Sequence, residues 1–592
     1  MFKLLLTLAA LIAQSFQILV PTHLVMGSER ALAAESWADG QIQSMSEDEE
    51  IGQLIVPAMI GGFVDRDSAQ FQDIARNITE FHVGGYHLLG DVNAPHDPAG
   101  VTLLINHMQA LAKVPLFITA DFEGGVGYRF EGATRLPRGM VMGATGNPEM
   151  AYQAGKIAAE EAKAMGFNVN FYPVVDVNNN PRNPIINIRS FGSDPAVVGR
   201  MGAAYIRGLQ EAGVMATAKH FPGHGDAATD SHLELPSIDV DRARLDTIEL
   251  PPFQAAMKAG VGAVMSAHIA LPKIVPSGVP ATLSHEMLTG LLRAELGFKG
   301  VIFTDAMNMQ GVAGHYANSD AAVKAIQAGA DIILYPPSVE DAFTALKLAV
   351  DTGLISRERV HESVRRILES KQHLGLARGQ TADVDKLDSL LGTTQHRQIA
   401  RRIIEQGITL VKNDKNTLPV KLSDDQKVLY VSVLDGEEGW GGGIPGHAFE
   451  AALVQRHART TSVTVSDRTS PGEFSLIRKL AALSDVIIVG GWVRVAAFKG
   501  SIGLSEGQVN LLKGLATLKK PFAFVLFGSP YFISFVPELP TCVMTYEYYP
   551  EAEEAAVRAV LGEIPFKGKL PVEIPGMYPL GYAASQATAA GK

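Results

Sequence analysis

The sequence contains very little cysteine and no excess of basic charge. Cys542 is the only cysteine among 592 residues, which excludes a disulfide framework within the chain and a cluster of cysteine metal ligands. The chain has 51 basic and 62 acidic residues, a net charge of −11, which excludes a general nucleic-acid or polyanion binder. Charged residues make up only 19% and hydrophobic residues 47%, so the bulk of the chain is not disordered and can bury a sizeable core.

The length allows several small domains or two large ones. At roughly 150 residues per domain, 592 residues correspond to about four units, but one α/β barrel can take about 250 residues or more. The 58 glycines and 32 prolines are spread along the chain and predict many tight connections. This composition is typical of an α/β protein with many loops.

The first residues have the pattern of a targeting segment. Lys3 is followed by the apolar run 4–13, which Gln14 interrupts too early for a membrane span. The tripeptide 31–33, Ala-Leu-Ala, matches the small-x-small pattern of a cleavage site. We expect residues 1–34 to be a signal peptide, and the mature protein to be secreted or periplasmic and not attached to a membrane. An uncleaved anchor is the alternative.

Short apolar runs alternate with longer amphipathic segments from residue 50 onward. Several of the intervening segments have helical periodicity, including 148–165, 195–211 and 283–296. Eight strand–helix units over this length predict a (β/α)8 barrel, which we place at residues 38–375. The eight runs are 53–60, 84–89, 115–121, 168–177, 214–220, 263–268, 300–305 and 331–335.

A second, smaller domain is predicted after a polar segment at 376–398, which we interpret as a linker. Residues 399–585 are expected to form an α/β sandwich domain, and residues 586–592 a tail. The predicted strands are 428–434, 486–491, 522–528 and 542–546, and the predicted helices include 506–518 and 551–561.

Polar and charged residues stand where five successive strands of the predicted barrel end. In a barrel, the carboxyl ends of all strands face one rim, and active sites lie there. A series of five such strand ends is difficult to explain by loop capping alone. The residues are Asp121, Asp176, the pair Lys219-His220, His268 and Asp305.

The fifth run continues into a loop rich in histidine. The segment 219–225 reads Lys-His-Phe-Pro-Gly-His-Gly, and Asp230-Ser231-His232 follows, with too much glycine and proline for a helix. A metal site is one alternative, but the histidines lack the helical spacing of metal ligands. Asp230 and His232 can pair in a bent loop, where the carboxylate fixes the ring tautomer and favours proton transfer. A surface histidine without a catalytic role is the other alternative.

Asp305 ends the seventh run beside two methionines, Met307 and Met309. A carboxylate at a barrel rim can act as a nucleophile or stabilise a cation. Metal ligation and capping of the strand end are competing interpretations of Asp305.

Taken together, these motifs resemble the glycoside hydrolases of family 3, in the β-N-acetylhexosaminidase branch. The segment 219–225 followed by Asp-Ser-His closely resembles the signature of that branch, and 183–192 is similar to its substrate loop. Asp-Phe-Glu-Gly-Gly at 121–125 and Thr-Asp-Ala-Met at 304–307 match in the same order. The resemblance covers roughly residues 40–380 and extends less sharply to about 585.

The resemblance implies a retaining exo-β-N-acetylglucosaminidase of the bacterial two-domain form. It implies that Asp305 is the nucleophile and that His232, paired with Asp230, is the general acid/base. Such a pair departs from the usual two carboxylates, and a neutral histidine repels an anionic attacking group less. The residues expected to bind the sugar are Asp121, Arg129, Arg189, Lys219 and His220.

The resemblance implies no cofactor, no metal and no obligate protein partner. The expected substrate is an N-acetylglucosamine-containing oligosaccharide or muropeptide. Whether the natural substrate is a peptidoglycan fragment, a chitin oligomer or a glycoconjugate stays open.

Two departures from the family pattern bear on this interpretation. Many relatives take an acid/base glutamate from a second-domain loop, but the corresponding loop here, 491–501, contains no Asp or Glu, and Glu506 is a weak substitute. Val126 stands where this branch often carries arginine, which puts the ring contacts near Arg129 in doubt. The alternatives are a β-glucosidase or β-xylosidase of the same family and a non-catalytic sugar-binding protein.

Overall fold

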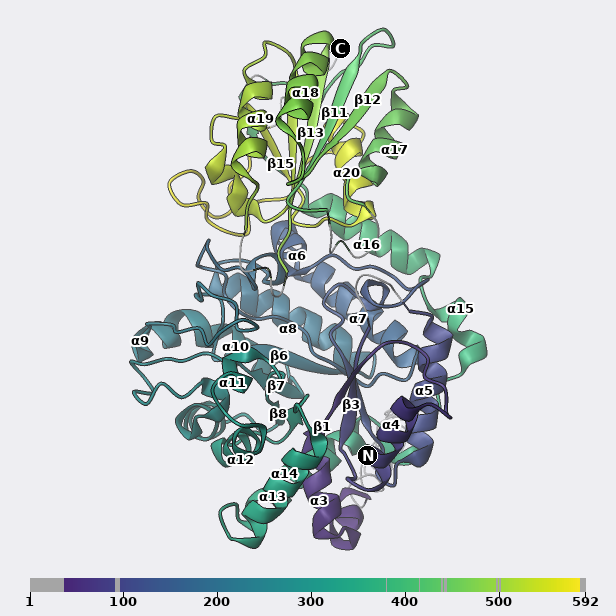
Figure 1. The fold of residues 1–592 in the computed structure, drawn as a ribbon, viewed down its shortest axis with the longest axis vertical. Helices are drawn as coiled ribbons and strands as arrows, with labels where there is room; N and C mark the ends of the chain where they lie inside the picture. The colour runs from purple at the N-terminus through teal and green to yellow at the C-terminus, as the bar shows by residue number, and fades with distance from the viewer. Residues whose placement is uncertain are drawn as a thin grey trace, which may run out of the picture.

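The computed structural model describes residues 37–90, 96–379, 381–414, 416–437, 440, 444–496, 499 and 502–585. The predicted signal peptide, 1–34, and tail, 586–592, lie outside the described residues. Among the residues that are described, no helix combines the length and hydropathy needed to cross a bilayer. The described chain forms a barrel, made of a seven-stranded and a two-stranded sheet, and a separate six-stranded sheet; each has its own helices and lies in one half of Figure 1.

The first sheet curls into a parallel barrel, which confirms the predicted fold class. Its first strand is divided at Pro57 into β1 and β2, and β1 pairs in parallel with β9. A bridge between Phe303 and Ile332 joins the last two strands, so the ring is continuous. In chain order the strands are β1 (Ile55–Val56), β2 (Ala58–Ile60), β3 (Gly85–Leu89), β4 (Phe117–Ala120), β5 (Val169–Asn170), β6 (Met215–Phe221), β7 (Ala263–Ser266), β8 (Val301–Phe303) and β9 (Ile333–Leu334).

Helices of the barrel begin at residues that favour helix starts. Helix α8 begins at Pro195, and the side chain of Asp194 accepts a hydrogen bond from the Val197 amide as an N-cap. The predicted segment 283–296 forms a π-helix over its central part. The main barrel elements are α4 (Ala69–Thr79), α5 (Pro98–Leu111), α6 (Gly139–Thr145), α7 (Pro148–Ala164), α8 (Pro195–Glu211), α10 (Leu250–Lys258), η5 (Glu286–Glu295), α12 (Asn318–Ala328), α13 (Val339–Asp351) and α14 (Arg357–His373).

The second sheet has six strands, two more than the sequence predicted. Its order is β10-β15-β14-β13-β11-β12, and the edge strand β10 is antiparallel to β15 while the other pairs are parallel. Strand β12 escaped prediction because it is a half-exposed edge strand of alternating Thr, Ser and Val, without an apolar run. The strands are β10 (Thr409–Asn413), β11 (Val428–Leu434), β12 (Thr460–Val465), β13 (Val486–Val493), β14 (Phe522–Gly528) and β15 (Thr541–Met544).

Helices cover both faces of this sheet, as Figure 1 shows. Helices α17 (His447–Arg456) and α20 (Pro550–Val560) pack on one face, and α18 (Pro471–Leu483) and α19 (Glu506–Ala516) on the other. Because both faces of the sheet are covered, all residues of the central strands β11, β13 and β14 are buried and nearly all of them are apolar or glycine. The result is an α/β sandwich domain.

The segment predicted as a linker has short helical turns and is bound to the barrel. It contains α15 (Leu387–Leu390), and the following helix α16 (Thr394–Gly407) starts within it. Asn106 of the barrel exchanges two hydrogen bonds of 2.9 Å with the backbone of Ala382. These contacts hold the connection against the barrel surface.

The second domain packs on the rim loops that follow β4 and β5. Asn178 Nδ2 donates to the hydroxyl of Tyr531 at 2.8 Å, and Ser193 N donates to Pro571 O at 3.0 Å. Arg138 donates from its backbone and side chain to both oxygens of Glu547, at 3.0 and 2.5 Å. The second domain therefore contacts the same end of the barrel at which the strand-end residues gather.

Candidate active site

The barrel brings the predicted strand-end residues to one rim. Strand β6 ends at Phe221 and carries Lys219 and His220. Three of the other polar residues come within two residues of their strand ends, and Asp176 follows six residues after the end of β5. Since all eight strands are parallel, their carboxyl ends meet around one opening. The polar residues that follow strands are Asp121 after β4, Asp176 after β5, His268 after β7 and Asp305 after β8.

Four charged side chains form a continuous chain of ion pairs at this rim. Lys219 Nζ lies 2.6 Å from Asp121 Oδ1 and 2.9 Å from Glu123 Oε1. Glu123 in turn accepts two hydrogen bonds of 2.8 Å from Arg189. The structure thus brings together three predicted sugar-binding residues, Asp121, Arg189 and Lys219. The carboxylate that connects the two cations belongs to Glu123, for which the sequence predicted no role.

These pairs keep all four groups charged at neutral pH. Burial raises the pKa of Asp121, but Lys219 and His87 lower it by more than burial raises it. The pKa of Asp121 therefore lies well below its usual range. Burial likewise raises the pKa of Glu123, and Arg189 and Lys219 more than offset this. Burial lowers the pKa of Lys219, but Asp121 and Glu123 raise it above its ordinary value. The site therefore presents fixed charges of both signs to a ligand.

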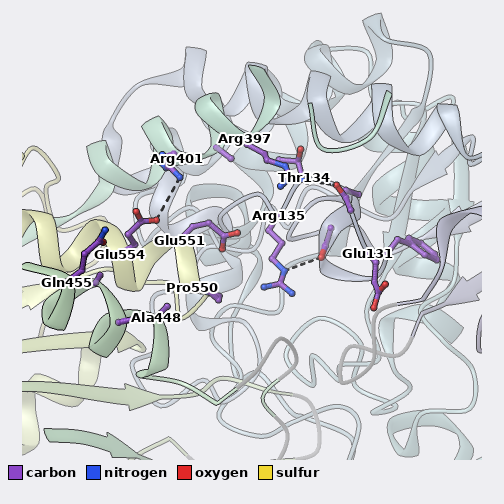
Figure 2. Close-up of a pocket in the computed structure, with 17 residues that line it drawn as sticks. Glu131, Thr134, Arg135, Arg397, Arg401, Ala448, Gln455, Pro550, Glu551 and Glu554 are labelled. Atoms are coloured by element: carbon purple, nitrogen blue, oxygen red, sulfur yellow. Dashed lines mark hydrogen bonds and ion pairs between the residues drawn. The ribbon is translucent and has the colours of Figure 1, made fainter. Parts of the chain in front are cut away.

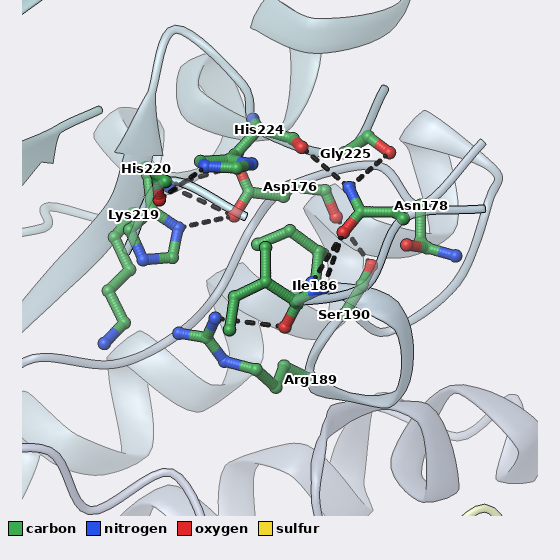
Figure 3. A network of polar contacts seen from close by, with 12 residues as sticks. Asp176, Asn178, Ile186, Arg189, Ser190, Lys219, His220, His224 and Gly225 are labelled. Carbon is green, nitrogen blue, oxygen red and sulfur yellow. Dashed lines mark hydrogen bonds and ion pairs between the residues drawn. The ribbon is translucent and has the colours of Figure 1, made fainter. Parts of the chain in front are cut away.

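Asp176 holds two histidines, His220 in β6 and His224 in the loop that follows it (Figure 3). Its carboxylate accepts hydrogen bonds from the ring of His220 at 2.7 Å and from the backbone amide of His224 at 2.6 Å. The Asp176 side chain has no exposed surface, and His220 has little. The ring of His220 is thereby fixed, with Nδ1 turned toward Asp176.

Asp230 and His232 form the predicted pair. His232 Nδ1 lies 2.7 Å from Asp230 Oδ1, which also accepts the backbone amide of His232 at 2.9 Å. The carboxylate is buried, whereas 24% of the His232 side chain is exposed. The histidine can therefore reach a ligand while its other ring nitrogen stays bound.

Asp305 is a partly exposed carboxylate surrounded by histidines. Its Oδ1 accepts the backbone amide of Ala306 at 2.8 Å. Burial raises the pKa of Asp305, but His220 and His268, followed by the Ala306 amide and His232, hold it below its ordinary value. The carboxylate is thus ionised at neutral pH, as a nucleophile requires.

Arg129 lies in the loop after β4 but points away from the Asp121 cluster, toward the end of β3. Its Nη1 donates to Gly90 O at 2.6 Å, and its guanidinium lies 4.9 Å from the centre of the Tyr128 ring. Nearby Val126 is completely buried. Within the described part of the chain, Arg129 has no ion pair with the carboxylates of the Asp121 cluster.

Several residues of this rim had no predicted role. Glu123, Asp176 and His224 occur in or beside the motifs, but their partners are distant in the sequence. His87 also had no predicted role. Its Nε2 lies 3.3 Å from Asp121, and its Nδ1 contacts Thr119 at 2.8 Å. A polar residue inside an apolar strand was the available signal for His87.

A separate cleft of about 1070 Å³ lies between the two domains. It is formed by the loop after β4 and by α16, α17 and α20, and arginines and glutamates project into it (Figure 2). Arg401 and Glu554 pair across it at 3.8 Å. None of the predicted site residues lines this cleft, so it is distinct from the strand-end cluster.

Residues 491–501 of the second domain contain no Asp or Glu. Glu506 is exposed and starts α19, where it sits next to the capping residue Ser505. Among the described residues, no group of three or more His, Cys, Asp or Glu side chains has a metal-binding arrangement. The described side chains at the rim include an ionised carboxylate, an Asp–His pair and a set of fixed charges.

Comparisons of the sequence and the fold with known proteins point to one enzyme family. Residues 46–370 match the family model described as the glycosyl hydrolase family 3 N terminal domain. A Cellulomonas fimi protein named beta-N-acetylglucosaminidase/beta-glucosidase is 32% identical over 91% of this chain and 95% of its own length.

Two solved structures are similar over nearly the whole chain. A family 3 beta-N-acetylglucosaminidase from Paenibacillus sp. str. FPU-7 has a TM-score of 0.81 and 34% identity, covering 90% of this chain and 99% of the other. A structure described as a beta-glucoside phosphorylase bound to 2FGlc also has a TM-score of 0.81, with 26% identity over 92% and 97% of the two chains.

Proposed function

Because this chain belongs to glycosyl hydrolase family 3, we propose that it is a retaining exo-acting β-N-acetylglucosaminidase. The observation that carries the proposal is the buried Asp230 bound to the partly exposed His232 in the loop beside Asp305. A β-glucosidase of the same family usually needs a carboxylate from the second domain, and residues 491–501 contain none. The names of the relatives support the same substrate class.

In the first proposed step, a carboxylate oxygen of Asp305 attacks the anomeric carbon of the terminal sugar. The bond from that carbon to the glycosidic oxygen breaks, and His232 Nε2 donates a proton to the departing oxygen. Asp230 stabilises the protonated ring before transfer and keeps Nδ1 protonated afterwards. The product is a covalent sugar ester of Asp305.

In the second step, the neutral His232 removes a proton from water as the water oxygen attacks the same carbon. The ester bond breaks, and Asp305 leaves as a carboxylate. Two displacements at one carbon restore the original β configuration, which defines a retaining enzyme.

The charged cluster of Asp121, Lys219 and Arg189 supports binding of the sugar. Asp121 can accept hydrogen bonds from sugar hydroxyls, while the two cations donate hydrogen bonds to hydroxyl or acetamido oxygens. Since the cluster is already assembled and paired, little side-chain entropy is lost when the sugar binds. His220, fixed by Asp176, completes this set.

The proposal is tested by hydrolysis of 4-nitrophenyl β-N-acetylglucosaminide and 4-nitrophenyl β-glucoside. We expect faster hydrolysis of the N-acetylglucosaminide with retention of configuration, and accumulation of a labelled Asp305 with an activated 2-fluoro glycosyl fluoride. His232→Ala should slow natural disaccharides far more than nitrophenyl substrates, because a good leaving group needs little protonation. Preference for the glucoside would support the alternative β-glucosidase, and binding without turnover would support a sugar-binding protein.

A second candidate is transfer of the sugar to phosphate instead of water. A neutral histidine repels an anionic acceptor less than a carboxylate would, and one similar structure is described as a phosphorylase. The assay in phosphate buffer separates the two, because phosphorolysis yields a sugar 1-phosphate and hydrolysis yields the free sugar.

We further propose that the protein acts outside the cytoplasm, on peptidoglycan fragments or other N-acetylglucosamine-containing oligosaccharides. The support is the pattern of residues 1–34. Fractionation of cells, followed by N-terminal sequencing of the mature protein, tests this proposal.

A further inference from the structure

Ser231 lies between the two members of the Asp–His pair and faces the protein interior. Only 2% of Ser231 is exposed, whereas Leu233, two residues further along the same loop, is 47% exposed. The loop, which we define as residues 226–236, has no regular secondary structure that would hold its shape. Its position must therefore come from contacts with neighbouring elements.

The side chain of Ser231 is bound by His224. Ser231 Oγ and His224 Nε2 lie 3.0 Å apart, and both residues are buried. His224 is itself held firmly, because its amide donates to Asp176 at 2.6 Å and its carbonyl accepts from Asn183 at 2.9 Å. Asp176 lies at the rim in the segment that follows β5, so Ser231 is connected to the rim through His224 and Asp176.

His224 is suited to bind rather than to transfer protons. Burial, together with the nearby His220, lowers the pKa of His224 to about 4. The ring is therefore neutral at pH 7 and does not compete with His232 as an acid. What it offers the loop is a fixed hydrogen-bond partner.

The backbone of Ser231 is bound from the opposite side by the segment that carries Asp305. Gly311 N donates to Ser231 O at 3.2 Å, and Gly311 belongs to α11 (Gln310–Ala313), which follows Asp305 closely in the chain. A Cβ atom at position 311 would lie 3.1 Å from Ser231 O, so the absence of a side chain permits this approach. Residues 226–236 are thus held on one side by His224 and on the other side by α11.

We infer that Ser231 and His224 are positioning residues, which hold residues 226–236 so that His232 stays against the substrate bound at Asp305. The inference rests on the proposed role of His232 as acid/base. General acid catalysis requires the donor within hydrogen-bond reach of the departing oxygen, and a displacement of about 1 Å can cost on the order of 100-fold in rate. A loop held only at its ends would not meet this requirement.

The test compares Ser231→Ala and His224→Gln with the wild-type enzyme on two substrates. For N,N′-diacetylchitobiose, whose leaving group needs a proton, we expect kcat to fall roughly 10- to 100-fold with little change in KM. For 2,4-dinitrophenyl β-N-acetylglucosaminide, kcat should fall by less than about 3-fold. Ser231→Thr keeps the hydroxyl and should recover most of the loss, and Ser237→Ala, at an exposed serine just beyond the loop, should resemble the wild type.

A second arm separates positioning from general damage to the fold. In a His232→Ala background, Ser231→Ala should cause no further loss on either substrate, because the group that it positions is absent. Ser231→Cys, which keeps the volume but bonds weakly, serves if the alanine variant does not fold. Equal losses on both substrates, or an undiminished loss in the His232→Ala background, would overturn the inference.

The outcome also distinguishes this inference from the proposed function. If His232→Ala shows the leaving-group dependence and Ser231→Ala behaves like the wild type, only the positioning role is wrong. If His232→Ala shows no such dependence, the acid/base assignment fails and the positioning role fails with it.

Discussion

The carboxylate of Glu123 receives two hydrogen bonds of 2.8 Å from the guanidinium of Arg189, and the same carboxylate lies 2.9 Å from Lys219 Nζ. Arg189 and Lys219 are both expected to bind the sugar, and without Glu123 these two cations would lie near each other with only Asp121 to balance their charge. Glu123 thus sets the position of both cations.

Glu123→Gln should therefore weaken sugar binding more than it slows the chemical step. Hydrogen bonds to charged groups contribute about 1.5–3 kcal/mol, so KM and the inhibition constant for N-acetylglucosamine should rise roughly 10- to 100-fold. The measurement is steady-state kinetics with inhibition by the free sugar. The exposed Glu131→Gln is the matched control and should leave both constants unchanged. Unaltered constants in Glu123→Gln would show that the cations are positioned by other contacts.

Asp230→Asn should impair the chemical step and leave binding intact. Asparagine is nearly isosteric and can still accept a hydrogen bond, but it lacks the charge that stabilises the protonated His232 ring. We expect kcat to fall on the order of 10²- to 10⁴-fold. The inhibition constant for N-acetylglucosamine should change little, since Arg189, Lys219 and His220 are untouched. A large loss of affinity with unchanged turnover would instead make Asp230 a direct sugar ligand.

The ion pair between Arg138 and Glu547 should be important for holding the two domains together. Both side chains are nearly inaccessible, and the Arg138 guanidinium lies within 4.6–5.3 Å of the centres of three tyrosine rings. Arg138→Met alone leaves a buried carboxylate unpaired, which is expected to cost about 3–5 kcal/mol in the free energy of unfolding.

Chemical denaturation of three variants tests this. Arg138→Met and Glu547→Leu should each be strongly destabilised, and the double variant should recover much of the loss because no unpaired charge remains buried. Arg76→Met, which breaks exposed ion pairs with Glu80 and Glu340, is the control and should change the free energy of unfolding far less than either buried substitution. Additive losses in the double variant would contradict the prediction.

Glu553 should make the second domain less stable as the pH rises toward neutrality. Burial raises the pKa of Glu553 to about 7, although its carboxylate accepts the backbone amides of Gly446 and Phe449 at the start of α17. The folded state then binds a proton more tightly than the unfolded state, so stability falls between about pH 4.5 and 7, by about 3 kcal/mol for this group.

The comparison of wild type with Glu553→Gln isolates this contribution. Thermal unfolding of the second domain should become less dependent on pH in this range in the variant, since glutamine does not titrate. Glu554→Gln, a partly exposed neighbour on the same helix, should keep the wild-type pH dependence. If both variants keep it, Glu553 is not the responsible group.

Much of the fold could be predicted from the sequence, because its signals are local. Each of the eight apolar runs contains a strand of the barrel, and the runs 428–434 and 522–528 agree with β11 and β14. The strands that were missed or shortened have a different cause. Strand β12 is polar because it lies at an edge, and β5 is only two residues long because the chain after Asn170 leaves the regular ladder near Tyr172-Pro173.

The residue types of the candidate site were likewise evident from the sequence, because chemistry-bearing side chains stand at strand ends and in recognisable motifs. Asp305, the pair Asp230 and His232, and the segment 219–220 could all be named in this way. Their number and order along the chain sufficed to predict a rim site and a family.

Only the tertiary structure decided how these groups are paired. Glu123 and Arg189 are 66 residues apart, Asp176 and His224 are 48 apart, and Arg138 and Glu547 are 409 apart. No local pattern encodes such contacts, since they arise when the barrel brings its strand ends together and the second domain packs on them. Arg129 and Glu123 lie in the same loop after β4 but meet different partners. Arg129 lies against Gly90 and Tyr128, whereas Glu123 lies between the two cations Arg189 and Lys219.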